Sequence, residues 1–531
     1  MNYNKFIKIS CFSVLLIFST SCDKDFLETI PKGNISNSTF WKTKQDAEVA
    51  TNNLYNYLYD LEIFQWDAMS DISAADISSH GLTEIMYARG DQQSDNPYGE
   101  RIWDDSYKGI RAVNDVLANI DKVESIDPLL LAQFKGEARF IRSYIYTYLV
   151  MFFGDVPLIT EPLGIEEARN LPRTNKEDIW DFVEDEFQTI SGDLLVSYNN
   201  TNKGRITQGA ALAMKTRAML WAGRYLEAKN AAKTIIDTEN YELYPNYETL
   251  FSYQAENNTE VILDKQFIKD TYSNNVFHVL APFSQNSSTS DFYPSGNMID
   301  AYEMDNGLAI DDPTSTFDPS NPYNDRDPRL SYSVFVHGDL LPDGTIYDPR
   351  PNFGGRDDIN LGFQTTGTGF NIKKYVNQQD LSDTQNNGIN IILIRYADVL
   401  LMYAESKIEL NEIDQSVYDA INDIRERNDV NMPQIGTGLS QQELREIVRH
   451  ERLVELAFEG LRLFDIKRWQ IAPDVMNGKI PGLTYTDNND DLQTYYMTDY
   501  QRAFSAPRDY LWPIPQKEME INPNYVQNTG Y

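Results

Sequence analysis

The stretch that decides the fold is ILIRYADVLLMYAESKIEL (residues 392–410), followed by SVYDAINDIRERN (416–428) and SQQELREIVRHERLVELAFEGLRLFDIKRW (440–469). In each piece apolar side chains recur three or four residues apart, which is the spacing of one helical face. The first piece places five residues at that spacing: Ile394, Ala397, Leu401, Ala404 and Ile408. The pattern predicts three helices joined by short breaks, each needing a neighbour to cover its apolar face.

The third of these helices carries a signal at each end. Ser440 and Glu443 form the S-x-x-E arrangement, in which two side chains satisfy backbone N–H groups at a helix start. Gly460 suits the left-handed residue that commonly ends a helix. We therefore predict a helix that begins at Ser440 and ends near Gly460.

Two other regions have helical patterns. Residues 134–153 are strongly apolar, and residues 208–237 place small side chains three or four apart on two successive segments. Small side chains at those offsets let two helices pack closely, as in a tetratricopeptide repeat. Thr174 and Glu177 form a further T-x-x-E pair, which predicts a helix start there. The predicted fold class is therefore mainly α, with a scaffold of tetratricopeptide-like helical hairpins.

Helical spacing disappears between residues 261 and 390. This segment is rich in Gly, Pro, Asn, Ser and Asp, and its alternating runs SYSVFVHG (331–338) and FNIKKYV (370–376) predict small strands. A long irregular segment within a compact protein is usually functional or disordered. Its frequent aromatic residues favour an ordered, functional insertion.

Charge and cysteine usage limit the functions of the chain. A formal charge of −34 argues against a nucleic-acid partner, because phosphates would be repelled. The two cysteines are Cys11 and Cys22, so the chain after residue 22 has no disulfide, thiolate nucleophile or cysteine metal cluster.

The N-terminus predicts export. Lys5 and Lys8 precede an apolar run (9–18) that is too short to span a bilayer permanently, as in a secretory signal. Small residues before Cys22 predict a lipoprotein site at which the thiol is acylated, although Ser19 stands where leucine is usual. The alternative is a plain signal peptide with an incidental cysteine.

These observations divide the chain into two parts. Residues 1–21 are predicted to be a lipoprotein signal peptide, and residues 22–531 the mature domain. Within that domain the helical scaffold comprises residues 22–260 and 391–531, and the irregular insertion comprises residues 261–390.

Several phrases resemble one protein family. They are RYADVLLMYAE (395–405), RHERLVELAFEGLRLFDIKRW (449–469), DRDPRL (325–330) and DYLWPIPQKEMEINPNYVQNTGY (509–531). In their sequence and in their order along the chain, these segments resemble the SusD/RagB family. Its members are lipid-anchored, outer-surface nutrient-binding proteins that pair with TonB-dependent transporters. Asp23-Lys24-Asp25 resembles the acidic tag that directs such lipoproteins to the cell exterior.

The resemblance implies a function. It implies an outer-membrane protein that is held by lipid on Cys22, faces the cell exterior and binds an oligosaccharide, which it delivers to a SusC-like TonB-dependent transporter. It also implies ligand sites in loops near the first repeat and in the long insertion. Peptide import by a relative of the same family is a nearby alternative, and a general tetratricopeptide module that binds a partner peptide is another.

Loop residues supply the groups that a sugar site needs. A sugar has apolar C–H faces flanked by hydroxyl groups, so its site needs flat rings together with Asp, Asn or Arg. The candidate ligand-binding residues are Trp66, Asp67, Asp71, Arg89, Phe292, Tyr293 and Arg356. For each of them a packing or turn role is the alternative.

One carboxylate pair raises the alternative of a surface glycoside hydrolase. Glu451 and Glu455 lie one helical turn apart, and two carboxylates are what glycoside hydrolysis requires. We favour a structural role, in which they pair with arginines such as Arg395 or Arg462, because charges in a helix interface need partners. We therefore expect a binding protein without catalytic residues.

Cofactor motifs are incomplete. His450-Glu451 has valine where the H-E-x-x-H zinc motif needs its second histidine, and Gly367-Thr368-Gly369 is not followed by a Walker lysine. Asp305-Asn306-Gly307 and residues 318–327 have oxygen ligands that suit calcium, but the same residues also form turns. We predict no cofactor and no metal, with calcium left open.

Overall fold

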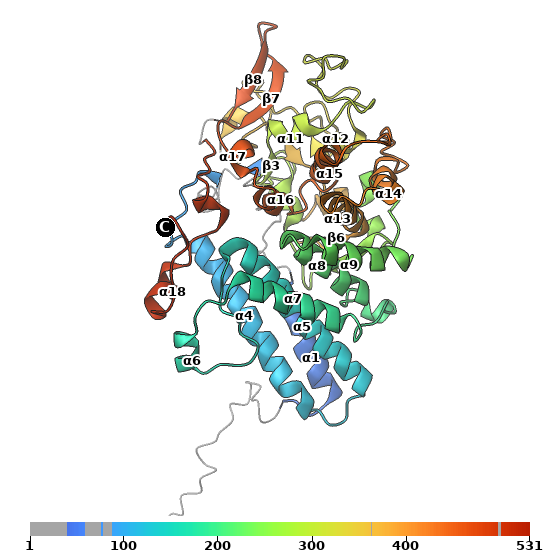
Figure 1. The fold of residues 1–531 in the computed structure, drawn as a ribbon. Coiled ribbons are helices and arrows are strands. Elements are labelled where there is room, and N and C mark those ends of the chain that lie inside the picture. Colours follow the sequence, from blue (N-terminus) through green and yellow to red (C-terminus); the bar gives the residue numbers. More distant parts are fainter. Residues whose placement is uncertain (1–39, 59–75, 78–87, 363, 498–500) are drawn as a thin grey trace, which may run out of the picture.

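The computed structural model describes residues 40–58, 76–77, 88–362, 364–497 and 501–531. Figure 1 shows helices stacked side by side, from α1 and α5 at the lower end to α13, α14 and α15 at the upper right. The predicted mainly α class with a scaffold of helical hairpins is confirmed. Among the described residues, no helix combines the length and apolar character needed to cross a membrane.

The N-terminal part of the scaffold is a run of helices that pack in succession. The long ones are α1 (Lys44–Leu54), α4 (Pro97–Asn119), α5 (Pro128–Phe153), α7 (Lys176–Ile190), α8 (Gln208–Trp221) and α9 (Tyr225–Asp237). Each of α4, α5, α7 and α8 contacts the next member of the series. α5 begins before its apolar run, because Asp127 caps it by accepting from the N–H of Leu129 at 2.9 Å and Pro128 suits the first helical position.

The C-terminal part continues the same stack. It contains α13 (Tyr396–Glu409), α14 (Gln415–Arg425), α15 (Gln441–Glu455) and α16 (Arg462–Arg468). α13 packs on α9 as well as on α14 and α15, although the insertion separates α9 from α13 in sequence. The stack of hairpins therefore runs across the insertion without a break.

Residues 391–395 correct the sequence prediction. We expected them to begin a helix, but they form strand β6 (Ile391–Arg395), which pairs antiparallel with β2 (Val261–Lys265). All five β6 residues are buried, and β-branched isoleucine favours a strand when a partner is present. The β2–β6 ribbon joins the two ends of the segment that we predicted as the insertion.

α15 begins as predicted and ends early. Ser440 Oγ accepts from the N–H of Glu443 at 3.2 Å, and the Glu443 carboxylate accepts from the N–H of Ser440 at 2.7 Å, which confirms the capping pair. The helix ends at Glu455, before the predicted glycine stop. The carbonyl of Glu455 accepts instead from Tyr247 Oη at 2.8 Å and Arg395 Nη2 at 2.7 Å, so side chains replace the next helical N–H.

The predicted start of α7 at Thr174 is wrong by one residue. Asn175 caps the helix, accepting from the N–H of Glu177 at 2.9 Å. Thr174 instead holds the segment after α5, since its N–H donates to Val156 O at 3.0 Å and its Oγ1 accepts from Leu158 N at 3.3 Å. A neighbouring strand-like contact therefore decides which of two adjacent polar residues caps the helix.

The described strands are short and pair two by two. β4 (Val334–Phe335) pairs with β5 (Asn371–Ile372), which confirms the two strands predicted in the insertion. β1 (Asp76–Ile77) pairs with β3 (Tyr293–Pro294), and β7 (Pro481–Thr486) with β8 (Leu492–Tyr496) in a hairpin that projects at the top of Figure 1.

Short helices complete the described chain. The α-helices are α6 (Ile165–Asn170), α10 (Val276–Leu280), α11 (Gly296–Ala301), α12 (Pro328–Ser333), α17 (Ala472–Val475) and α18 (Gln516–Ile521). The three-residue 3-10 helices are Tyr55–Tyr57, Ile120–Lys122, Asn200–Asn202, Tyr247–Thr249, Tyr253–Ala255, Ile359–Leu361, Gln378–Asp380 and Arg508–Tyr510.

Candidate functional site

Two predicted ligand-binding rings, Phe292 and Tyr293, lie inside the protein. Tyr293 is 0% exposed and packs with Ala88, Ile480 and Met497. Its strand β3 pairs with β1, the strand that follows residues 66–71 in sequence. The packing role that we weighed for both rings accounts for their burial, and ligand contact by them stays a prediction. The other predicted positions Trp66, Asp67 and Asp71, and the lipidation residue Cys22, lie outside the described residues.

The two predicted arginines lie at the surface. Arg89 forms an ion pair of 2.6 Å with Asp91. The Arg356 guanidinium lies 5.2 Å from the ring centroid of Phe283, and its Nη1 donates to Ser284 O at 3.3 Å. Both arginines have local partners and an exposed side chain, and their role in ligand binding stays a prediction.

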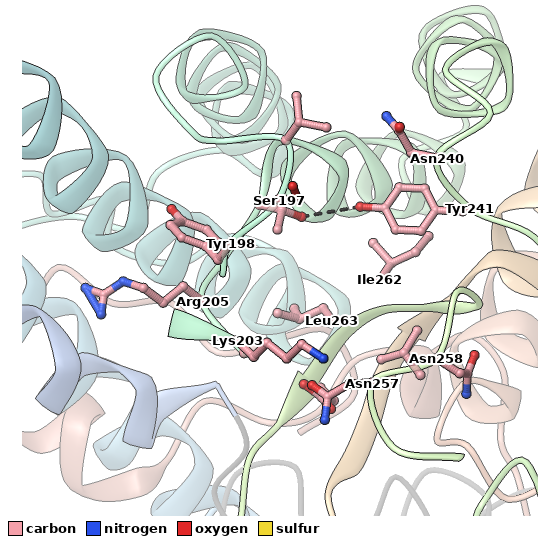
Figure 2. A pocket seen from close by; sticks show the side chains of 15 residues that line it. Ser197, Tyr198, Lys203, Arg205, Asn240, Tyr241, Asn257, Asn258, Ile262 and Leu263 are labelled. Atoms are coloured by element: carbon pink, nitrogen blue, oxygen red, sulfur yellow. Dashed lines mark hydrogen bonds between the residues drawn. The ribbon is translucent and has the colours of Figure 1, made fainter. Parts of the chain in front are cut away.

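A polar cavity that we did not predict lies beside β2. It has a volume of about 270 Å³ and is formed by the loop after α7, the loop after α9 and the residues around β2. Figure 2 shows Tyr198 and Tyr241 on opposite sides of it, with Lys203 and Asn257 near the strand. We call this cavity the Tyr241 pocket; its polar lining includes Tyr198, Lys203, Arg205, Asn240, Tyr241, Asn257, Asn258 and Asp264.

The lining of the Tyr241 pocket suits a polyhydroxylated ligand. Tyrosine rings offer flat faces, and asparagine amides both donate and accept hydrogen bonds. Burial raises the pKa of Asp264 to about 6, and its carboxylate accepts from Gln266 Nε2 at 2.7 Å. The sequence signal for this site was two asparagine-rich runs, NNTNKG (199–204) and ENN (256–258), on either side of the α8–α9 hairpin.

Arg205 is fixed at one wall of this pocket. Its Nε donates to Glu137 Oε1 at 3.1 Å and its Nη1 to Asn52 Oδ1 at 2.7 Å. Glu137 also accepts from Tyr55 Oη at 2.9 Å. Burial raises the pKa of Glu137, and the guanidinium of Arg205 opposes that effect. These hydrogen bonds hold the Arg205 guanidinium against α1 and α5 at the pocket wall.

Gly209 sets the position of the Tyr241 ring. A Cβ atom at this point of α8 would lie 2.1 Å from Tyr241 Oη, which is closer than real Cβ contacts allow. Tyr241 Oη lies 3.5 Å from Thr207 Oγ1 at the start of the same helix. The absence of a side chain at Gly209 is thus what lets the phenol reach the pocket.

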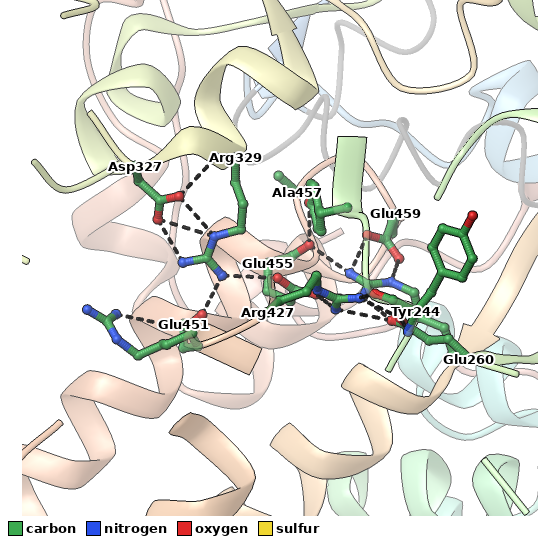
Figure 3. Close-up of polar contacts among 12 residues, drawn as sticks. Tyr244, Glu260, Asp327, Arg329, Arg427, Glu451, Glu455, Ala457 and Glu459 are labelled. Atoms are coloured by element: carbon green, nitrogen blue, oxygen red, sulfur yellow. Dashed lines mark hydrogen bonds and ion pairs between the residues drawn. The ribbon is translucent and has the colours of Figure 1, made fainter. Parts of the chain in front are cut away.

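The carboxylates considered for glycoside hydrolysis are enclosed by arginines (Figure 3). Glu455 accepts from Arg395 Nη1 at 2.7 Å, Arg427 Nη2 at 2.8 Å and Arg329 Nη1 at 3.0 Å. Burial alone would raise the pKa of Glu455, but the three guanidinium groups outweigh it and hold that pKa well below its usual range. This carboxylate therefore stays ionised, and its oxygens are occupied by arginines of the scaffold and the insertion.

Glu451 is bound in the same way. It accepts from Arg329 Nη1 and from Arg425 Nη1, the latter at 2.9 Å, and its side chain is buried like that of Glu455. The favoured structural role of the pair is confirmed. Arg395 is a partner as predicted, whereas Arg462 lies 5.8 Å from the ring centroid of Trp469.

The residues considered for calcium form turns. Asp318 Oδ1 accepts from Ser320 N at 2.9 Å and its Oδ2 from Asn321 Nδ2 at 2.7 Å, and Asn306 Oδ1 accepts from Leu308 N at 3.0 Å. In the part of the chain that the structure describes, no three His, Cys, Asp or Glu side chains are grouped to hold a metal ion.

Two family models match the chain. The one described as the SusD family matches residues 259–531, which is more than half of the chain. The chain belongs to the SusD family. A second model, described as starch-binding associating with outer membrane, matches residues 25–220, so residues 221–258 lie between the two matches.

This SusD-family protein resembles its relatives along their whole length. It is 27% identical to SusD-like protein P25 of Formosa agariphila, covering 98% of each chain. A SusD-like carbohydrate-binding protein from Bacteroides fragilis superposes with a TM-score of 0.85 at 31% identity, over 92% of this chain and 100% of that one. Surface glycan-binding protein A from Bacteroides thetaiotaomicron, in complex with laminarihexaose, superposes with a TM-score of 0.69 at 18% identity over 92% and 100%, which shows a shared fold.

Proposed function

We propose that this SusD-family protein binds an oligosaccharide at the cell surface and delivers it to a SusC-like TonB-dependent transporter. The observation that supports the proposal best is the match over the full length of the Bacteroides fragilis carbohydrate-binding protein, at 31% identity. The shared fold of the laminarihexaose complex adds to it. The mechanism is binding and release, without bond making, and the burial of Glu451 and Glu455 removes the carboxylate pair that favoured a hydrolase.

The proposal includes a membrane tether at Cys22. Acyl chains on this residue would hold the protein at the outer membrane, each buried CH₂ contributing about 0.8 kcal/mol. The family description that mentions the outer membrane supports this location. The chain would face the cell exterior, where the transporter can receive its ligand.

We place the saccharide in the Tyr241 pocket or in the loops that carry the predicted residues. The pocket offers two phenols, three amides and a carboxyl within one cavity of about 270 Å³, the scale of a saccharide unit. The predicted loops offer Trp66 and Arg356. Both regions can contribute to one binding protein, and substitutions separate their contributions.

The test is a glycan-array screen followed by calorimetry on the chain from residue 23 onward. We expect at least one oligosaccharide to bind. Tyr241→Ala or Trp66→Ala should weaken it about tenfold, since a lost ring contact and hydrogen bond amount to 1–3 kcal/mol. Tyr496→Ala is the matched control, because Tyr496 is an exposed tyrosine on the projecting hairpin. Binding of peptides without any glycan would favour the peptide-import alternative and overturn the proposal.

A further inference from the structure

A second cleft lies against the C-terminal segment. Its lining includes the start of α7 and the end of α8, whereas the Tyr241 pocket is lined by the residues that follow α7 and precede α8. It has a volume of about 760 Å³ and lies where α5, α8 and α16 end, next to the first half of α7. We call it the Lys467 cleft. Residues 507–511 and 526–529 close its other side.

The charge of this cleft is opposite to that of the protein. Its lining holds five cationic residues and two acidic ones, although the whole chain carries a formal charge of −34. The cationic residues are Arg173, Lys176, Lys467, Arg468 and Arg508, and the acidic ones are Asp155 and Glu177. Cations gathered in a concave site attract anions locally against the repulsion of the remaining surface.

Two of these arginines are already committed to the fold. Arg173 donates to Asp155 O at 2.6 Å, to Phe153 O at 3.2 Å and to Val526 O, and so joins the C-terminal end of α5 to the C-terminal segment. Arg468 is bound by Glu405 at 2.5 Å. They contribute positive potential and have little capacity for a ligand.

Lys467 is different. It is 5% exposed, and among the described residues its ammonium has a single hydrogen-bond acceptor, Met151 O at 2.9 Å. Burial lowers the pKa of Lys467 to about 7, opposed by Asp509, whose carboxylate itself accepts from Arg508 Nε at 2.6 Å and Ser505 N at 2.6 Å. When protonated, Lys467 Nζ has three N–H donors, so two of them lack a hydrogen-bond acceptor within the described chain, and an anion beside Nζ would favour this protonated form.

The cleft has other N–H donors besides Lys467 Nζ. The indole N–H of Trp221 is buried and has no acceptor among the described residues. Arg508 uses Nε and Nη2, the latter donating to Gly90 O at 2.6 Å, and the ammonium of the exposed Lys176 lies 3.9 Å from the Glu177 carboxylate. The wall therefore carries a surplus of donors, and a ligand that matches it must bring acceptors and negative charge.

We propose that the Lys467 cleft is a second binding site of this protein, for the oxyanion of an acidic saccharide, either the carboxylate of a uronic acid or a sulfate ester. Lys467 Nζ and the Arg508 guanidinium hold the oxyanion, and Tyr510 and Leu511 cover the sugar ring. The saccharide part of this inference rests on the proposed function, whereas the oxyanion part rests on the cleft alone.

The test uses the chain from residue 23 onward, labelled with 5-fluorotryptophan, with the Trp221 signal assigned by Trp221→Phe. D-glucuronate and inorganic sulfate are the anionic probes, and glucose is the neutral probe. We expect glucuronate to shift the Trp221 signal and to bind about tenfold more tightly than glucose, because a charge-assisted hydrogen bond contributes that much. Lys467→Met and Lys176→Gln should weaken glucuronate binding, and Lys233→Met is the matched control, because Lys233 is an exposed α9 lysine that lines neither the Lys467 cleft nor the Tyr241 pocket.

Each outcome decides the inference. Equal binding of glucuronate and glucose, an unmoved Trp221 signal at saturation, or full affinity in Lys467→Met would overturn it. A response to sulfate alone would refute the saccharide part. If Lys467→Met does not fold, the wild-type Trp221 signal and the surface variant Lys176→Gln still give the answer. Failure of every oligosaccharide in the glycan screen would overturn the proposed function separately, because monomeric glucuronate tests this cleft directly.

Discussion

Arg217 Nη2 donates to Asp398 Oδ2 at 2.8 Å across the contact between α8 and α13. The other oxygen of Asp398 accepts from Arg452 Nη1 on α15 at 3.0 Å, and all three side chains are buried. Burial alone would raise the pKa of Asp398, but the two guanidinium groups outweigh it and hold that pKa below its usual value. One carboxylate thus joins helices from both sides of the insertion.

Asp398→Ala should strongly destabilise the protein. Removing one member of a buried charge network leaves the arginines uncompensated, which costs about 3–5 kcal/mol. Urea unfolding followed by circular dichroism measures this change. Asp115→Ala is the matched control, because the 3.8 Å pair with Arg111 is exposed and should contribute less than about 1 kcal/mol. Equal effects of both substitutions would contradict the role of Asp398.

The buried carboxylates should make the protein sensitive to acid. Because the folded-state pKa of Glu455 lies below the unfolded value near 4.5, its stabilisation is present above about pH 4.5 and is lost as pH falls further. Glu455→Gln should lower stability at pH 7 and flatten the decline between about pH 4.5 and 3. Unfolding curves at several pH values test this, with exposed Glu124→Gln as the control. An unchanged slope in Glu455→Gln would refute the prediction.

Asp264 should lower the stability of the protein as the pH rises, which is the opposite of the effect of Glu455. Its folded-state pKa is raised from 3.8 to about 6, so its contribution is most favourable below about pH 4 and is lost as pH rises through 6. Asp264→Asn should therefore be more stable than the wild type at pH 7.5, by about 2–3 kcal/mol, and equal to it near pH 4. The measurement is the difference in unfolding free energy at these two pH values. A gap of the same size at both would show that Asp264 does not titrate in this range.

Gly209→Ala should reshape the Tyr241 pocket. The new methyl group overlaps the Tyr241 phenol, so the ring must move although alanine favours the helix. We expect a lower affinity for the oligosaccharide found in the screen, measured by calorimetry, with little loss of stability. Gly436→Ala is the control, because a Cβ there meets nothing within 4 Å. Unchanged affinity would remove the pocket from the proposed binding surface.

Cys22→Ser should release the protein from the membrane. Without the thiol no acyl chain can be attached, and the aqueous phase is then favoured. Fractionation of cells that express each form measures the membrane-bound share, and Cys11→Ser is the matched control. Retention of Cys22→Ser in the membrane fraction would contradict a lipid tether at this residue.

Local patterns predicted the features that depend on neighbouring residues. The three helices after residue 391, the cap at Ser440 and the strands of the insertion follow from spacing within a few residues. The pairing of Glu455 with Arg395 was predicted because a charge in a helix interface needs an opposite charge.

Distant partners decided the rest. Residues 391–395 look helical alone and become a strand because β2 pairs with them. α15 ends at Glu455 because Tyr247 and Arg395 take its carbonyl. The Tyr241 pocket is assembled from three separate segments and the Lys467 cleft from six, so no single stretch of sequence shows either one.

Because β2 pairs with β6, the region between Lys265 and Ile391 leaves the helical scaffold and returns to it at one place, so its loops can vary while the scaffold stays the same. Its two ends emerge side by side, and the entropy of closing a loop grows only slowly with length, so loops between them can lengthen or change without moving the helices. Any such change should keep the residues of this region that contact the helical scaffold. Among them are Arg329, which binds Glu451 and Glu455, and Lys374, which donates to Ala457 O at 2.7 Å. A new ligand preference can thus be installed on an unaltered frame.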